Sequence, residues 1–331
     1  LYKLAKDELA QSKEKLVVWA GGDAPNQQDM LIDLFTKRFP GVPLHLTVDL
    51  SKYHDIKVYQ QLMDGYLVPD VVMLQTMNDF EDWKAMGALE PFKPESFPHL
   101  KKGYSDADGA FLGVFMFCFL PQYAKEGVAS TPKSYEDFLK PEFKNKLVMT
   151  PPHDDDAVLF VYDHIIKKHG IDFLKKLAAQ NPTFVRGTAA PAILAGRQGY
   201  LGNITGYPTY PADPSIGFIP KDDFFVSWPQ RAAIFKLTRH KNAAKLFLAY
   251  LTSYEHQSAR GTWSVREDVT PPDSLGAIES YKNTNPLEFI QWMRDRKHIH
   301  ELRMQMQEIF GPVKGESPLT DPDLLRLYYR P

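Results

Sequence analysis

Residues 153–156 read His-Asp-Asp-Asp and form the most unusual polar stretch of the chain. An aspartate at the start of a helix caps free backbone N–H groups and suits the helix dipole. One cap needs one carboxylate, however, and three adjacent carboxylates repel each other. Histidine with aspartate is also a donor set for a hard or borderline metal ion, which Asp23 or His54 could complete. The stretch therefore predicts a helix cap, a site for a cation, or both, and leaves the presence of a metal open.

Other polar loops follow the predicted strands. In open α/β sheets, ligands bind beyond the carboxyl ends of the strands, where backbone N–H groups and helix N-termini converge. This rule selects loops 21–27, 49–54 and 75–78 in the first part of the chain, and loops 150–156 and 202–207 in the second. The candidate ligand-binding residues in these loops are Asp23, Gln75, Thr76, His153, Asp154, Asp155, Asn203, Thr205 and Tyr207.

The loop at 202–207 is polar but uncharged. Asn203, Thr205 and Tyr207 offer neutral hydrogen-bonding groups, which suit an organic solute. Asn203 also begins an Asn-Ile-Thr sequon, which we expect to stay unglycosylated because the residue lies in a predicted binding site.

Two further side chains are candidates for ligand contact. Aromatic residues cluster at 115–117 and 224–228 and are expected mostly in the core, but Trp228 is our choice to stack on a ring or sugar. Arg186 is the best candidate to bind an anionic group, and its alternative role is a surface salt bridge.

Short apolar runs alternate with amphipathic stretches and place these loops. The predicted strands cover 16–20, 44–48 and 70–74, and the predicted helices cover 27–39, 53–64 and 77–86. Strands separated by helices imply a parallel, doubly wound sheet with right-handed crossovers. The pattern restarts at Lys146 with a strand over 147–149 and a helix over 155–168. It ends with a strand over 231–237 and a helix over 242–252. The predicted fold class is therefore α/β, with two doubly wound lobes joined by a two-stranded hinge.

The restart of the pattern also predicts the division of the chain. Lobe 1 is expected to contain residues 1–114 and 228–331, lobe 2 residues 118–224, with hinge segments near 115–117 and 225–227. A single long helix is predicted over 286–310, followed by a tail packed on the surface.

The composition excludes several classes of protein. A formal net charge of −2 gives no electrostatic reason to expect nucleic acid or an anionic membrane as partner. The longest apolar run, 111–121, is shorter than the roughly 18 residues of a membrane span, so no transmembrane segment is predicted. The single cysteine, Cys118, excludes an intramolecular disulfide. No hydrolase, nucleotide-binding or metalloprotease signature is present, and we predict neither a cofactor nor a catalytic residue.

The stretch 113–149, GVFMFCFLPQYAKEGVASTPKSYEDFLKPEFKNKLVM, passes from an apolar strand through a polar turn into a second apolar strand. It resembles the extracellular solute-binding proteins of bacterial ABC importers, in the iron(III)-binding-protein-like branch of the type II periplasmic binding fold. The segments AAIFKLTRHKNAAKLFLAYLTSYEHQ (232–257) and TWSVREDVTPP (262–272) resemble the hinge strand, the following helix and the next loop of the same family.

The resemblance implies that the protein captures a small solute between two hinged lobes and is not an enzyme. It further implies an extracellular or periplasmic, secreted monomer with an ABC permease as a possible partner. The start at Leu1, without the regions of a signal peptide, is what we expect of a mature chain.

The family pattern also bears on the ligand. Family members commonly carry Ser, Gly and Thr near 153–156, facing an anion, so acids there imply a cationic or polar organic ligand or a metal complex. Iron-binding members carry two adjacent tyrosines in the loop that matches 202–207. Only Tyr207 lies there in this chain, so direct binding of ferric ion is not expected. The alternatives are a secreted protein of the same fold without a transport role, and an enzyme of cofactor synthesis.

Overall fold

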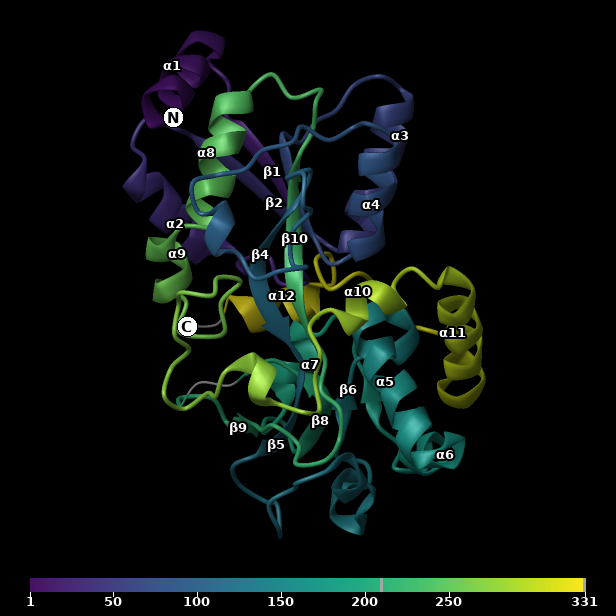
Figure 1. Ribbon diagram of the computed structural model, residues 1–331. Helices are drawn as coiled ribbons and strands as arrows, with labels where there is room; N and C mark the ends of the chain where they lie inside the picture. Colours follow the sequence, from purple (N-terminus) through teal and green to yellow (C-terminus); the bar gives the residue numbers. More distant parts are fainter. Residues whose placement is uncertain (209–210, 330–331) are drawn as a thin grey trace. The chain divides into compact units, whose positions relative to one another are not determined.

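The computed structural model describes residues 1–208 and 211–329 (Figure 1). The chain divides into two compact units, with Leu1–Phe117 and Pro229–Tyr281 in unit 1, and Cys118–Trp228 and Lys282–Pro331 in unit 2. The chain therefore passes between the units three times, after residues 117, 228 and 281. The predicted division had two crossings and placed the C-terminal segment in lobe 1, whereas residues 282–331 group with unit 2.

Unit 1 is built on a five-stranded sheet with strand order β2-β1-β3-β10-β4. The strands are β1 (Leu16–Gly21), β2 (Leu44–Asp49), β3 (Val71–Leu74), β4 (Leu112–Cys118) and β10 (Ser227–Ile234). The first three are parallel, as predicted, but β10 runs antiparallel to β3. The sheet is mixed because β10 returns from unit 2 and enters the sheet from its opposite end.

Helices cover both faces of this sheet. Figure 1 shows α1 (Tyr2–Ser12), α2 (Asp29–Arg38) and α8 (Lys241–Leu251) on one face, and α3 (Ser51–Met63) and α4 (Met77–Ala85) on the other. The shorter elements of unit 1 are α9 (Tyr254–Ala259), η1 (Phe97–His99) and η5 (Ile278–Ser280). Where α3 and α4 pack on the sheet, aromatic side chains form a buried cluster with Val72 and Leu74: Trp19, Phe80, Trp83, Phe111 and Phe235. Burying these rings supplies much of the stability of the unit.

Unit 2 contains two small sheets instead of the second doubly wound sheet that the sequence predicted. One is antiparallel, with order β8 (Gly202–Gly206), β5 (Leu120–Ala124) and β9 (Ser215–Gly217). The other is a parallel pair of β6 (Val148–Met149) and β7 (Thr183–Phe184). A single parallel bridge between Leu147 and Gly202 connects them.

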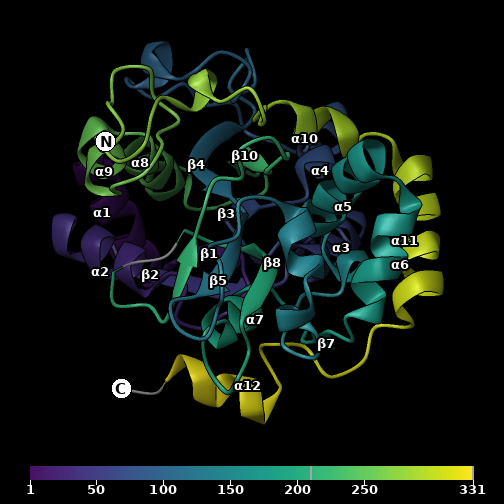
Figure 2. The same cartoon turned by 90° about the horizontal axis from the view of Figure 1, so that it is seen from below.

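The helices of unit 2 surround these sheets. They are α5 (Asp156–His169), α6 (Ile171–Ala179), α7 (Ala189–Leu194), α10 (Glu288–Trp292), α11 (Arg296–Phe310) and α12 (Pro322–Tyr328), with the 3-10 turns η2 (Tyr135–Leu139), η3 (Pro141–Phe143) and η4 (Pro152–Asp154). Figure 2 shows α11 beside α5 and α6, and α12 beside α7, in agreement with their contacts. None of the described helices is long and apolar enough to cross a bilayer.

The C-terminal segment joins unit 2 through its contacts with α5. The predicted single helix over 286–310 is divided into α10 and α11, and Asp295 caps α11 by accepting from the His298 N–H group at 3.0 Å. Trp292 Nε1 donates to Asp163 Oδ2 at 2.9 Å, and Phe289 packs on Phe160 with ring centroids 5.5 Å apart. These aromatic and polar contacts explain why the segment belongs to unit 2, and helical periodicity alone does not reveal them.

Candidate functional site

The carboxylate of Asp154 is paired within the protein. Arg186 Nε lies 2.8 Å from Asp154 Oδ2, and Arg186 Nη2 lies 3.1 Å from Asp154 Oδ1, which is a bidentate pair. Only 14% of the Arg186 side chain and 8% of the Asp154 side chain are exposed. The salt bridge that was the alternative role of Arg186 is therefore present, and it is largely buried.

The next two aspartates also have structural partners. Asp155 is the N-cap of α5 and accepts from the N–H groups of Ala157 and Val158 at 2.8 and 3.0 Å. Asp156 forms ion pairs with two arginines of α11, Arg296 and Arg303. The repulsion among three carboxylates is therefore relieved inside unit 2, which removes the electrostatic reason for expecting a cation at this loop.

The sequence leaves the presence of a metal open, and the arrangement of possible ligands bears on that question. Across residues 1–208 and 211–329, no group of three or more His, Cys, Asp or Glu side chains is arranged to hold a metal ion. His153 lies in η4 and is half-buried beside the paired aspartates. His54 lies in α3, where its ring stacks on the Trp19 ring of β1 with centroids 4.9 Å apart. Burial lowers the pKa of His54 to about 4.

The residues predicted in the loop 202–207 lie mostly in strand β8. Asn203 and Thr205 are completely or almost completely buried. Asn203 Nδ2 donates to Gln122 Oε1 at 3.2 Å, and Asn203 Oδ1 accepts from the Thr205 N–H group at 3.2 Å. Gln122 Nε2 in turn donates to the Tyr207 carbonyl oxygen at 3.0 Å. Periodicity missed the strand because its glycines and polar residues are stabilised by antiparallel pairing with β5.

Two further features follow from this network. The burial of Asn203 keeps the sequon out of reach of glycosylation in the folded protein. Gly206 allows the close approach of Gln122, since a Cβ atom at Gly206 would lie 2.1 Å from the Gln122 side chain.

The three candidates of unit 1 come together at one edge of the sheet. Asp23 follows β1, and Gln75 and Thr76 follow β3, the neighbouring parallel strand. The Asp23 N–H group donates to Gln27 Oε1 at 3.1 Å, and the Gln75 N–H group donates to Ser51 Oγ at 3.0 Å. The loops are therefore held in place by hydrogen bonds at the carboxyl edge, as the strand rule predicts.

Trp228 does not expose a ring face for stacking. Its side chain is 2% exposed and packs against Phe119 and Phe289, with ring centroids 5.1 and 5.6 Å apart. The prediction that it stacks on a ligand is not supported by this structure, because both neighbours belong to the aromatic core of unit 2.

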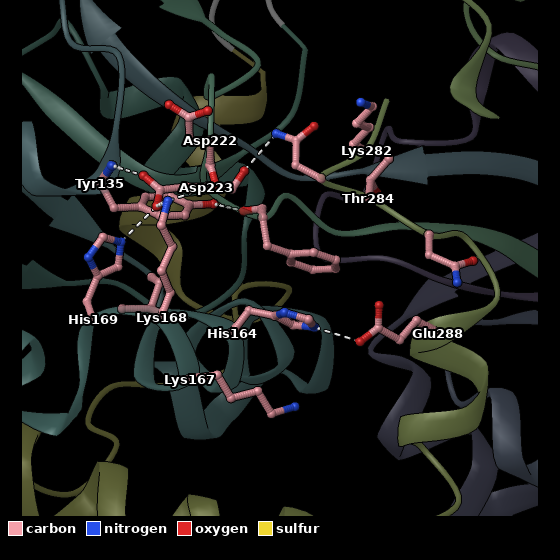
Figure 3. Close-up of a pocket in the computed structure, with 14 residues that line it drawn as sticks. Tyr135, His164, Lys167, Lys168, His169, Asp222, Asp223, Lys282, Thr284 and Glu288 are labelled. Carbon is pink, nitrogen blue, oxygen red and sulfur yellow. Dashed lines mark hydrogen bonds and ion pairs between the residues drawn. The ribbon is translucent and has the colours of Figure 1, made fainter. Parts of the chain in front are cut away.

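A separate pocket of about 430 Å³ lies in unit 2 at the C-terminal end of α5 (Figure 3). Three segments line it: residues 164–169 of α5, residues 222–224, and residues 282–288, together with Tyr135. The sequence alone does not reveal this pocket, because its lining segments are far apart in the chain. Its one visible signal was the run Lys167-Lys168-His169, which is also ordinary for a helix C-terminus.

Asp223 organises the inner wall of this pocket. Its side chain is 1% exposed and lies 2.6 Å from Lys168 Nζ and 2.7 Å from His169 Nε2, while the Tyr135 N–H group donates to it at 2.8 Å. Burial alone would raise the pKa of Asp223, but the bonds from Lys168, Tyr135 and His169 lower it below the ordinary value. Asp223 is therefore a buried carboxylate that stays ionised.

A histidine forms part of the opposite wall. The His164 ring lies parallel to the Phe224 ring at a centroid distance of 3.6 Å, and its Nε2 atom lies 3.0 Å from Glu288 Oε1. Burial lowers the pKa of His164, while the Glu288 carboxylate opposes that shift. Figure 3 shows His164 and Lys167 across the pocket from Asp222 and Lys282.

Comparison with known proteins identifies the class to which these lobes belong. Residues 67–294, more than half of the chain, match the family model described as bacterial extracellular solute-binding protein. The chain belongs to this family of extracellular solute-binding proteins, whose members serve ABC importers. No match was found among curated protein sequences.

Several solved structures share the fold at low sequence identity. The substrate-binding protein of an ABC transporter from Agrobacterium tumefaciens aligns with a TM-score of 0.75 at 15% identity, over 90% of this chain and 94% of that one. Iron-bound HitA from Pseudomonas aeruginosa aligns with a TM-score of 0.69 at 14% identity, over 88% of this chain and 99% of that one. AfuA from Actinobacillus pleuropneumoniae, with fructose-6-phosphate bound, aligns with a TM-score of 0.70 at 14% identity, over 90% of this chain and 99% of that one. The predicted two-lobe α/β fold and solute-binding class are confirmed, and the ligand is not determined by this likeness.

Proposed function

We propose that this protein captures a polar organic solute between its two units and closes on it about the segments where the chain crosses. The family match over residues 67–294 carries this proposal. Polar loops held at the carboxyl edge of the unit 1 sheet support it, because this edge is where ligands of such sheets bind.

The internal pairing of the acidic loop narrows the proposed contacts. We infer that Asp23, Gln75 and Thr76 contact the solute from unit 1, and that His153 and Tyr207 contact it from unit 2. Asp154 and Asp155 instead hold the loop through Arg186 and the α5 cap. Because Asp155 already occupies the first free N–H groups of α5, an anionic group of the solute would not find them available.

The family also suggests the biological setting. We infer a periplasmic or extracellular protein that delivers its solute to an ABC permease and acts as a monomer without turnover. A bound compound that is chemically converted would support the enzyme alternative instead.

The proposal is tested by native mass spectrometry of the purified protein, followed by titration calorimetry with any compound that dissociates. We expect a polar organic molecule of defined mass, and an at least tenfold weaker affinity in Asp23→Ala or Thr76→Ala. Asp64→Ala, exposed after α3, serves as the matched control. Ferric ion forms a second arm, in which a visible phenolate-to-iron band lost in Tyr207→Phe would overturn the proposed solute class. Absence of any retained compound, together with no thermal stabilisation by sugars, amino acids or polyamines, would overturn solute capture.

A further inference from the structure

The pocket at the end of α5 lies apart from the loops proposed for solute capture. It opens at His164–His169, whereas the loop 153–156 precedes the first turn of the same helix. A helix of 14 residues is about 20 Å long, so the two regions are at opposite ends of α5. A ligand in this pocket would be distinct from the solute of the proposed function.

The inner wall of the pocket is rigidly built. Asp223 ties Tyr135 of η2 to Lys168 and His169 at the end of α5. Asn283 Nδ2 donates to the carbonyl oxygens of Pro220 and Asp223, at 2.7 Å each. These bonds hold the two lining segments 222–224 and 282–288 side by side.

Most charges of the pocket are already neutralised. Lys168 pairs with Asp223, Lys167 Nζ lies 2.9 Å from Asp163 Oδ2, and His164 lies beside Glu288. Lys282 and Asp222 are different, because both side chains are exposed and neither has an ion-pair partner among the residues that the structure describes. The pocket thus offers one uncompensated ammonium and one uncompensated carboxylate on the same side (Figure 3).

We propose that this pocket binds a small zwitterionic solute, of the size of an amino acid or a short peptide, with its carboxylate toward Lys282 and its ammonium toward Asp222. The volume of about 430 Å³ lies within the range of small-molecule sites, roughly 300–1,000 Å³. A ligand with one carboxylate and one ammonium group can pair with Lys282 and Asp222 at the same time. A simple anion pairs with Lys282 alone and a simple cation with Asp222 alone, so each leaves the other side chain without an opposite charge.

The pocket is lined by segments that adjoin two of the chain crossings. Residues 222–224 precede the crossing after Trp228, and Lys282 directly follows the crossing after Tyr281. The Phe225 N–H group donates to the Asn283 carbonyl oxygen at 3.1 Å, and the hydroxyl groups of Ser227 and Thr284 lie 2.7 Å apart. A ligand that contacts both segments therefore stabilises this pairing.

The test uses glycine, glycylglycine and triglycine as probes, with N-acetylated and C-amidated glycylglycine as matched analogues that each lack one charge. Calorimetry and saturation-transfer NMR on the full chain measure binding. We expect at least one zwitterion to bind, and both blocked analogues to bind at least tenfold more weakly. Asp222→Lys and Lys282→Asp are each expected to lose binding, and the double exchange to recover it, because one charge of each sign is then restored. Lys297→Glu, which is 87% exposed on α11, is the control that retains binding.

Three results would overturn the inference. They are no binding of any zwitterion, equal binding of the blocked analogues, and binding that survives both single charge changes. Binding that is lost in Asp23→Ala but not in Lys282→Asp would assign the zwitterion to the proposed capture site instead. The two proposals can also be told apart if no captured solute is found. Zwitterion binding that persists in the Asp23→Ala protein would then support this pocket, although the proposed function had failed.

Discussion

At the scale of single residues, buried carboxylates of unit 2 form hydrogen bonds and ion pairs with residues that are distant in the sequence. Asp223 binds Tyr135, 88 residues earlier, and Asp154 binds Arg186, 32 residues later. Asp223 remains charged although it is buried, because its donors replace the water that burial removes. Asp154 lies in a bidentate pair with the Arg186 guanidinium group. The sequence gives no sign that these aspartates are buried, but in the fold each one connects segments that are distant in the chain.

Replacing Asp223 by Asn should lower the free energy of unfolding by about 2 kcal/mol. The amide still accepts from the Tyr135 N–H group, but it loses the charge that holds Lys168 and His169, and bonds to charged groups contribute about 1.5–3 kcal/mol. Urea unfolding measures the loss, and Asp222→Asn is the matched control, expected within about 0.5 kcal/mol of the wild type. Equal effects of the two substitutions would contradict the role of Asp223.

The lowered pKa of Asp223 also predicts an acid-side loss of stability. Because the pKa is lower in the folded than in the unfolded state, the unfolded chain binds more protons at acid pH. The contribution of Asp223 is therefore complete above the unfolded pKa of about 4 and disappears as the pH falls through the folded pKa. Unfolding free energies measured from pH 7 to pH 3 should fall less steeply in Asp223→Asn, and an unchanged slope would contradict the assignment.

The pair of Asp154 and Arg186 should be structural. Asp154→Ala removes this carboxylate from a largely buried guanidinium group, and breaking a buried pair costs about 3 kcal/mol or more. The exposed pair of Asp172 and Lys175 is the matched control, for which Asp172→Ala should change stability by less than about 0.5 kcal/mol. A double-mutant cycle with Arg186→Ala measures the coupling, and no coupling would return Asp154 to the set of ligand contacts.

At the scale of elements, helix α5 connects the parts of unit 2. Its first turn is capped by Asp155 and contacts α11 through Asp156, and its last turn forms a wall of the pocket. The sequence predicted the helix over 155–168, close to its observed span, because apolar spacing and terminal charges are local signals. The partners at its two ends are not local, so the sequence did not identify them.

Asp155→Ala should destabilise the protein by about 1 kcal/mol, because two backbone N–H groups lose their acceptor. Asp155→Ser should recover most of that loss, since a hydroxyl oxygen can accept in the same position. Thermal unfolding of the three proteins measures both differences. A serine variant as unstable as the alanine variant would show that the charge, and not the cap, is what matters at this position.

At the scale of the whole molecule, the chain forms two units linked by three chain crossings. The third crossing, after residue 281, was absent from the predicted two-stranded hinge. Family membership shows a solute-binding protein, and the proposed mechanism is closure of the units on a captured solute. A solute that contacts both units gains its full set of contacts only in the closed form, so it shifts the population toward closure.

Binding of the captured solute should therefore lower the radius of gyration in small-angle X-ray scattering. The shift should disappear in Asp23→Ala at the same solute concentration, because the population of closed protein depends on differential affinity. An unchanged radius at calorimetrically confirmed saturation would contradict closure and favour a rigid binding scaffold.

The sequence by itself determined the first elements of unit 1 and the class of protein. Apolar spacing predicted the first three strands and helices, and the segment 113–149 carried the resemblance that the family match confirms. These features are local, since a strand or helix is specified by neighbouring residues, and a family by stretches of consecutive ones.

Only the tertiary structure decided which polar groups are available to a ligand. The aspartates at 154–156 looked like a cation site until Arg186 and the arginines of α11 were found beside them. Asn203 and Thr205 were expected to offer hydrogen-bonding groups to a ligand, but both lie in β8, a strand paired with β5. The pocket at the end of α5 is formed by three segments that are separate in the sequence. The reason is physical: whether a charge or amide is free depends on partners brought together by folding, and their distance along the chain carries no signal of that pairing.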